Sequence, residues 1–231
     1  MDHLDLRHTP FDIYLAIPTS CMNSHGRSDV TQALTDFFDE HCVFVKSQFD
    51  WWTHCAIEHA NGDALRVLLN MKRSKTCKGE IQLLAAACDT RDGTLVNVVL
   101  DNLNINYDAD SAASSPLCIA VRSGSVDCVQ AIIDHSPDSV HKRVKSNLRA
   151  KMYAGKDITA IELAIHRRED IGVIHCLHDH ASPLPPFHTW PFRQTTYELL
   201  RKYLQDRMGG EKEVPSLSKF VRMSNRQRLA W

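Results

Sequence analysis

The segment from Ser115 to Ile133, SPLCIAVRSGSVDCVQAII, constrains the fold of this chain more than any other part of the sequence. Ser115 has the side chain of a helix N-cap, and Pro116 occupies the first helical position, where its missing N–H group costs nothing. Gly124 stands where a left-handed residue must end that helix, since only glycine adopts a positive φ cheaply. The pattern predicts two short helices joined by a turn, each apolar along one face. Because such a pair cannot bury both faces alone, the segment requires neighbouring copies.

Weaker copies of this segment lie before and after it. Alanine recurs at one equivalent position in four segments, and successive alanines are 31, 33 and 44 residues apart. The first two spacings indicate a repeat of about 33 residues, and the third indicates an insertion of about one helix. The four equivalent residues are Ala56, Ala87, Ala120 and Ala164.

The motif SPLCIA at Ser115–Ala120 resembles the opening of the ankyrin repeat, whose first helix begins with the pattern T-P-L-H-x-A. In the copy WTHCAIEHANGDALRVLL, His54 takes the histidine position, where the family generally forms hydrogen bonds between neighbouring units. The other copies hold Ala85, Cys118 and Glu162 there, which weakens the expected ladder of hydrogen bonds. The resemblance implies an all-α fold, an ankyrin-type α-solenoid of stacked helix-turn-helix repeats with short connecting turns or hairpins.

The resemblance also divides the chain. Residues 1–45 are expected to form a degenerate N-terminal repeat or cap, opened by Thr9-Pro10-Phe11 and with its second helix over residues 29–38. The ankyrin-like repeats occupy residues 46–185, and a C-terminal capping helix and a flexible tail follow. The expected core units are 51–71, 82–106, 115–136 and 159–180, with a basic insertion at 139–156, the capping helix within 186–208 and the tail at 209–231.

Composition agrees with a folded chain that has a real core, since 43% of its 231 residues are hydrophobic. The longest apolar run, from Leu83 to Cys88, is too short to span a bilayer, and the N-terminal residues do not resemble a signal peptide. The eight cysteines form no C-x-x-C pair, and several fall on predicted core faces. These features predict a cytoplasmic or nuclear location, where thiols stay reduced.

The net charge of −1 conceals a gradient along the chain. Residues 1–70 sum to −6, residues 71–138 to −3 and residues 139–231 to +8. The stretch 141–156, HKRVKSNLRAKMYAGK, has six basic residues and no acidic one. Such a surface can steer an acidic segment of a partner to the basic C-terminal half. The alternative is an extended helix with solvated charges and with Val144, Leu148 and Met152 packed beneath.

Nucleic acid fits this charge less well, because no reading helix, zinc module or aromatic platform accompanies it. The densest group of histidines, His175, His178 and His180, lacks the additional ligand pair that a closed zinc site needs. No G-x-S-x-G motif, phosphate-binding glycine loop or H-E-x-x-H motif occurs in the sequence. The sequence therefore predicts no cofactor, no metal and no enzymatic activity.

The resemblance implies a non-catalytic protein–protein interaction module or adaptor that binds a partner protein through the concave face of the stack, and the sequence favours a monomer. Two alternatives stay open. One is a small enzyme or accessory factor that binds a small molecule in the groove and uses His59, Asp89 or His166 for acid–base work. The other is a host-directed effector that uses the same binding face.

In the ankyrin family, ligands usually meet the turns between repeats and the exposed side of each first helix. Trp51 is the strongest candidate, because aromatic residues dominate the energetics of interfaces. Its alternative role is to close the core between the first two units. The full set of partner-binding candidates is Phe49, Asp50, Trp51, Glu58, His59, Asp89, Tyr107, Asp108, Arg122, Tyr153, His166, Arg167 and Arg168. Of these, residues 49–51, Tyr107, Asp108 and Tyr153 are expected in the turns that precede the helices.

Overall fold

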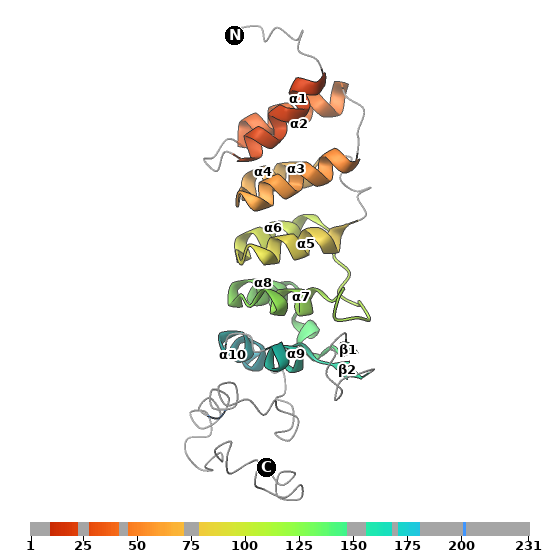
Figure 1. Cartoon of the computed structure of the whole chain (residues 1–231), viewed down its shortest axis with the longest axis vertical. Helices are drawn as coiled ribbons and strands as arrows, with labels where there is room; N and C mark the ends of the chain where they lie inside the picture. The colour runs from red at the N-terminus through yellow and green to blue at the C-terminus, as the bar shows by residue number, and fades with distance from the viewer. Residues whose placement is uncertain are drawn as a thin grey trace, which may run out of the picture. The chain divides into compact units, whose positions relative to one another are not determined.

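The computed structural model describes residues 10–22, 28–41, 46–71, 79–146, 156–167, 171–180 and 201 (Figure 1). These residues form helices, apart from connecting turns and one two-stranded sheet. The chain divides into two compact units, residues 1–107 (unit 1) and residues 108–231 (unit 2). None of the helices in the described ranges has the length and apolar character needed to cross a membrane.

The described part of unit 1 consists of helix pairs that stack in two layers (Figure 1). Each first helix packs against its own second helix and against the first helix of the next pair, and the second helices do the same. The first layer contains α1 (Pro10–Met22), α3 (Lys46–Glu58) and α5 (Glu80–Asp89), and the second contains α2 (Ser28–His41), α4 (Gly62–Leu69) and α6 (Gly93–Asn102).

Unit 2 repeats this arrangement with two further helix pairs. Helix α7 packs on α9 in one layer, and α8 packs on α10 in the other. A 3-10 helix and a short antiparallel sheet connect the two pairs. The elements are α7 (Pro116–Ser123), α8 (Val126–His135), η2 (Pro137–His141), β1 (Val144–Lys145), β2 (Asp157–Ile158), α9 (Ala160–Arg167) and α10 (Ile171–Asp179).

The turn that ends the first helix has the same backbone shape in three repeats. Gly124 has a φ of 70°, as its sequence position predicted, and Ser115 and Pro116 take the N-cap and first helical positions of α7. Ala60 and Arg91 occupy the equivalent positions and have φ values of 52° and 62°. The left-handed turn is therefore a property of the repeat and persists where glycine is absent.

The residue that follows this turn caps the second helix in each of the three repeats. Its side-chain oxygen accepts a hydrogen bond from a backbone N–H in the first turn of that helix, which is otherwise an unsatisfied donor. Asn61 does more, because its Nδ2 also donates to the Cys21 carbonyl at the end of α1, at 3.1 Å. The cap pairs are Asn61 with Ala64, Asp92 with Thr94, and Ser125 with Cys128.

Small residues allow the first helices to pack closely. Ala56, Ala87, Ala120 and Ala164 are all 0% exposed, which agrees with the equivalence inferred from their spacing. The second helices contribute mainly aliphatic side chains to the core, such as Leu65 and Leu68 of α4. The largest fully buried side chain is that of Trp52 in α3.

The described part of the basic insertion contains the end of η2 and strand β1, which forms a β-hairpin with β2 directly after the insertion, so the alternative of an extended helix is wrong there. Val144 is buried, as expected, but it lies in β1 opposite Ile158 of β2. The loop before α7 pairs with the other side of β1, where Lys145 donates its N–H to Asp110 and accepts from Ala112. These bonds satisfy backbone groups that a helix would have used. Several expectations concern residues outside the described ranges. They are the packing of Leu148 and Met152, the capping helix within 186–208, of which only residue 201 is described, and the tail at 209–231.

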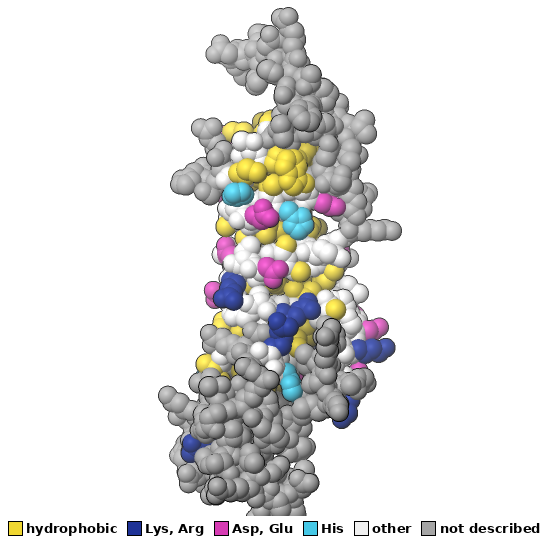
Figure 2. Space-filling model, in the orientation of Figure 1, with side chains coloured by type: hydrophobic (Ala, Val, Ile, Leu, Met, Phe, Trp, Pro, Cys, Tyr) yellow, Lys and Arg dark blue, Asp and Glu magenta, His cyan; other side chains and the backbone are white. Residues whose placement is uncertain are grey.

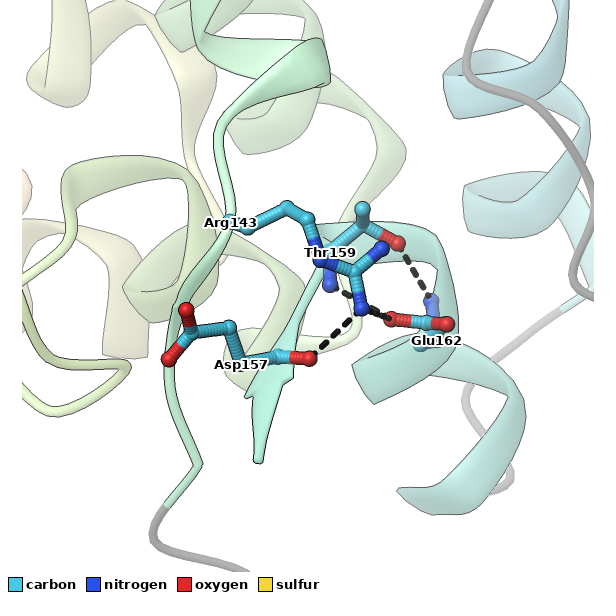
Figure 3. A network of polar contacts seen from close by, with 4 residues as sticks. All are labelled: Arg143, Asp157, Thr159 and Glu162. Carbon is cyan, nitrogen blue, oxygen red and sulfur yellow. Dashed lines mark hydrogen bonds and ion pairs between the residues drawn. The ribbon is translucent and has the colours of Figure 1, made fainter. Parts of the chain in front are cut away.

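Arg143 ties the hairpin to the start of α9 (Figure 3). Its Nη2 donates to the backbone carbonyl of Asp157 at 2.6 Å and lies 3.5 Å from the carboxylate of Glu162. Glu162 also accepts from the backbone N–H of Thr159 at 2.7 Å, and the Thr159 hydroxyl accepts from the Glu162 N–H at 3.4 Å. This reciprocal capping box fixes the first turn of α9.

Candidate functional site

Helix α3 carries an exposed face with an aromatic side chain at its centre. Trp51 is 44% exposed, and His54 and Glu58 are exposed as well. Their spacing of three and four residues places all three on one side of the helix. Trp52, the next residue, is 0% exposed. The buried aromatic position in this repeat therefore belongs to Trp52, and Trp51 faces solvent.

Neighbouring helices extend this face within unit 1. Asp89 is exposed on α5, at the position equivalent to Glu58 on α3, and the two helices pack side by side. His59 is exposed in the turn after α3, and Met22, the last residue of α1, is 43% exposed. Figure 2 shows hydrophobic side chains gathered over α1 and α3, with histidine and acidic side chains beside them.

Other candidates in the first repeats have different surroundings. The sequence suggested a turn at residues 49–51, but α3 begins at Lys46 and includes all three. Phe49 is 1% exposed, so its side chain belongs to the core of unit 1. Asp50 is half-buried. The structure thus leaves Trp51 as the aromatic residue of this segment that a partner can reach.

The candidates that precede α7 lie in a turn, as expected. Tyr107 is half-buried, and burial raises the pKa of its hydroxyl. Asp108 is exposed and forms an ion pair with Lys142.

Arg122 is half-buried at the end of α7, where its Nη2 donates to the Ala113 carbonyl at 3.4 Å. Arg122 therefore supports the loop that pairs with β1.

The last group of candidates lies at the end of α9. Arg167 is exposed, whereas His166 is half-buried. Burial lowers the pKa of His166, and the negative charge of Glu162 one turn earlier only partly opposes this effect. Tyr153 and Arg168 lie outside the described residues.

The groups considered for chemistry do not form a recognisable reaction centre in the described part of the chain. Across those residues, no three His, Cys, Asp or Glu side chains gather as a metal site would require. Six described cysteines are free and buried, and burial raises the pKa of Cys21 to about 12, which suppresses its thiolate. His59 and Asp89 lie exposed in unit 1, and His166 belongs to unit 2.

Two features of this part of the molecule were not predicted from the sequence. It did not identify Ala60 and Arg91 as left-handed residues, because neither is a glycine. It also singled out His54 only for bonds between repeats, although its side chain is exposed beside Trp51 on α3. Counting back from Gly124 by the alanine spacings of 33 and 31 residues reaches Arg91 and Ala60, so the repeat spacing could have identified both turn positions.

Comparison with known proteins supports the fold. No protein-family model matches the sequence, and no curated protein matches it either. Among solved structures, the ankyrin repeat domain of Bcl-3, described as a unique member of the IkappaB protein family, is similar with a TM-score of 0.58. The match covers 97% of each chain at 15% sequence identity. The chain has the all-α ankyrin-repeat fold that the motif at Ser115–Ala120 predicted.

Proposed function

We propose that this chain is a non-catalytic protein-interaction module that binds a partner protein through the exposed face of α3 and α5 in unit 1. The observation that carries the proposal is the exposure of Trp51 on a helix whose core position is already filled by Trp52. An adaptor of the cytoplasm or nucleus would use such a surface, and a host-directed effector would use the same one.

The energetic argument concerns the apolar area that Trp51 leaves in water. A tryptophan can bury roughly 200 to 250 Å², and 44% of its surface is exposed here. About 100 Å² is thus available to a partner, which corresponds to roughly 2.5 kcal/mol at about 25 cal/mol per Å². Since the residue is held on a packed helix, little conformational entropy is lost when it binds.

The test compares capture of partners from cell extract by the tagged full chain and by two variants. Trp51→Ala should weaken binding by about 2 kcal/mol, or about 30-fold, because it removes the central apolar contact. Val126→Ala is the matched control, because Val126 is also an exposed hydrophobic residue, at 38%, but begins α8 in unit 2. Circular dichroism should show both variants as helical as the wild type.

Proteins that are lost with Trp51→Ala and retained with Val126→Ala would support the proposal. If Trp51→Ala retains every protein that the wild type captures, α3 does not form the binding surface. If that variant loses its cooperative unfolding, Trp51 belongs to the core instead.

A further inference from the structure

We propose that the surface formed by Trp51, Glu58 and Asp89, here called the Trp51 face, binds an extended basic segment of its partner. The segment would place one Arg or Lys side chain over the Trp51 indole and a second on the two carboxylates. This inference rests on the proposed function, since it names the class of partner for the same surface.

The charge of unit 1 favours a cationic partner. Its described residues include 12 acidic and 3 basic side chains, and the whole of residues 1–107 includes 14 acidic and 9 basic. One of the described basic residues, Arg66, already lies 3.4 Å from Asp63 on α4, in the other layer. Unit 1 therefore has a net negative charge, which favours the approach of a basic segment.

The two carboxylates of the Trp51 face are available to such a segment. Glu58 and Asp89 are exposed, and neither forms an ion pair with any side chain in the described ranges. They occupy equivalent positions on helices that pack side by side, and packed helices lie about 8 to 10 Å apart. An arginine between them can therefore pair with one carboxylate and feel the attraction of the other.

The indole of Trp51 supplies the second contact. Tryptophan is the best aromatic partner for a cation, and the interaction requires the cation within about 6 Å of the ring. Trp51 and Glu58 are seven residues apart, which is about 10 Å along the helix axis. An extended chain advances about 3.3 Å per residue, so basic residues three positions apart match this distance.

The equivalent positions of unit 2 do not repeat the acidic pair. Arg122 and His166 stand there in place of Glu58 and Asp89. Unit 2 therefore offers a basic segment no comparable site at these positions. Because the acidic pair occurs at these positions in unit 1 and not in unit 2, we infer that the basic segment binds unit 1.

The experiment titrates two synthetic peptides, GRSGRSG and its acidic counterpart GESGESG, into isotope-labelled full-length protein and follows the indole N–H signals by NMR. The chain has four tryptophans, and the signal of Trp51 is the one that disappears in Trp51→Leu. The basic peptide should shift this signal and the acidic peptide should not. Raising the salt from about 50 mM to about 300 mM should weaken the effect, because exposed charges become screened.

Variants then separate the two contacts. Glu58→Gln combined with Asp89→Asn should weaken binding of the basic peptide by about 3-fold to 10-fold, through loss of exposed ion pairs. Trp51→Leu keeps an apolar side chain but should weaken binding by about 2-fold to 5-fold, as followed by the backbone amide signals of α3, since this variant lacks the Trp51 indole. The control is Asp36→Asn on α2, an exposed carboxylate of the second layer that accepts from Gln32 and should leave the affinity unchanged.

Equal shifts with both peptides, or unchanged affinity in the Glu58→Gln and Asp89→Asn double variant, would overturn the inference. The capture experiment with Trp51→Ala distinguishes this from failure of the proposed function. If Trp51→Ala loses a partner that the double variant retains, the surface binds a protein but not through a basic segment. If Trp51→Ala loses no partner, the proposed function itself is wrong.

Discussion

Replacing Ala60 by glycine should stabilise the protein. Ala60 has a φ of 52° at the end of α3 and its methyl group is exposed. A non-glycine residue in the left-handed region costs about 1 to 2 kcal/mol. Glycine removes that cost but increases the entropy of the unfolded chain, which offsets about 0.4 to 1 kcal/mol. The midpoints of these two ranges give an expected net gain for Ala60→Gly of about 0.8 kcal/mol.

The measurement is unfolding of the full chain by urea and, separately, by heat, each followed by circular dichroism. A gain of this size should raise the free energy of unfolding and shift Tm by about 2 to 3 °C in a chain of this length. Gly124→Ala is the reverse experiment, because Gly124 has a φ of 70° at the equivalent position. It should lower the free energy of unfolding by a similar amount.

Asn70→Gly provides the matched control. Asn70 is also exposed and also follows a helix, but its φ is −82°, which any residue adopts. Glycine should therefore destabilise the protein there by about 0.4 to 1 kcal/mol. If Ala60→Gly and Asn70→Gly change the free energy of unfolding in the same direction, the argument from backbone conformation is wrong.

Three further predictions concern buried groups. Asn61→Ala should cost about 2 kcal/mol in urea unfolding, because it removes a helix cap and the bond to the Cys21 carbonyl, and a loss of less than about 0.5 kcal/mol would contradict both roles. Burial lowers the pKa of His166 below its ordinary value of 6.5, so this histidine takes up a proton less readily in the folded state than in the unfolded state. As the pH falls below 6.5, the unfolded state is protonated first, and the free energy of unfolding should decrease. The urea midpoint of His166→Gln should depend less on pH than that of the wild type between about pH 7.5 and about pH 5.5, and an equal dependence would contradict the assignment. At most two of the eight cysteines should react rapidly with Ellman's reagent before denaturation, since six are buried, and rapid reaction of more than two would contradict their burial.

The helical repeats could be predicted because their signals are local. Ser115, Pro116 and Gly124 each have a backbone preference that specifies one position of the helix pair. The recurring alanines then locate the other copies, and all four are fully buried. These features depend on sequence spacing alone, so no tertiary information was needed to find them.

The roles of the adjacent tryptophans could not be predicted in the same way. Trp51 and Trp52 differ by about 100° around the helix, so the position of the helix axis decides which one is buried. The sequence suggested a turn at these residues, whereas α3 begins at Lys46. Burial of Trp52 follows from packing against neighbouring helices, which the local sequence does not encode.

The position of the hairpin formed by β1 and β2 could not be predicted, for a different reason. Its strands are two residues long, which is too short for an alternating pattern. The loop that pairs with β1 begins more than thirty residues earlier in the sequence, at Asp110. A strand stabilised by such distant partners leaves no periodic signal of its own.

The pairing of β1 with β2 has a consequence for engineering and for evolutionary change. Val144 and Ile158 lie directly opposite each other, so the two residues that flank the intervening sequence are close together. Lengthening the sequence between two such points costs little, because the entropy of closing a loop grows only slowly with its length. An epitope or a small fluorescent domain inserted between residues 146 and 156 should therefore leave the helices of unit 2 intact. A reporter inserted there would allow the protein to be followed in cells.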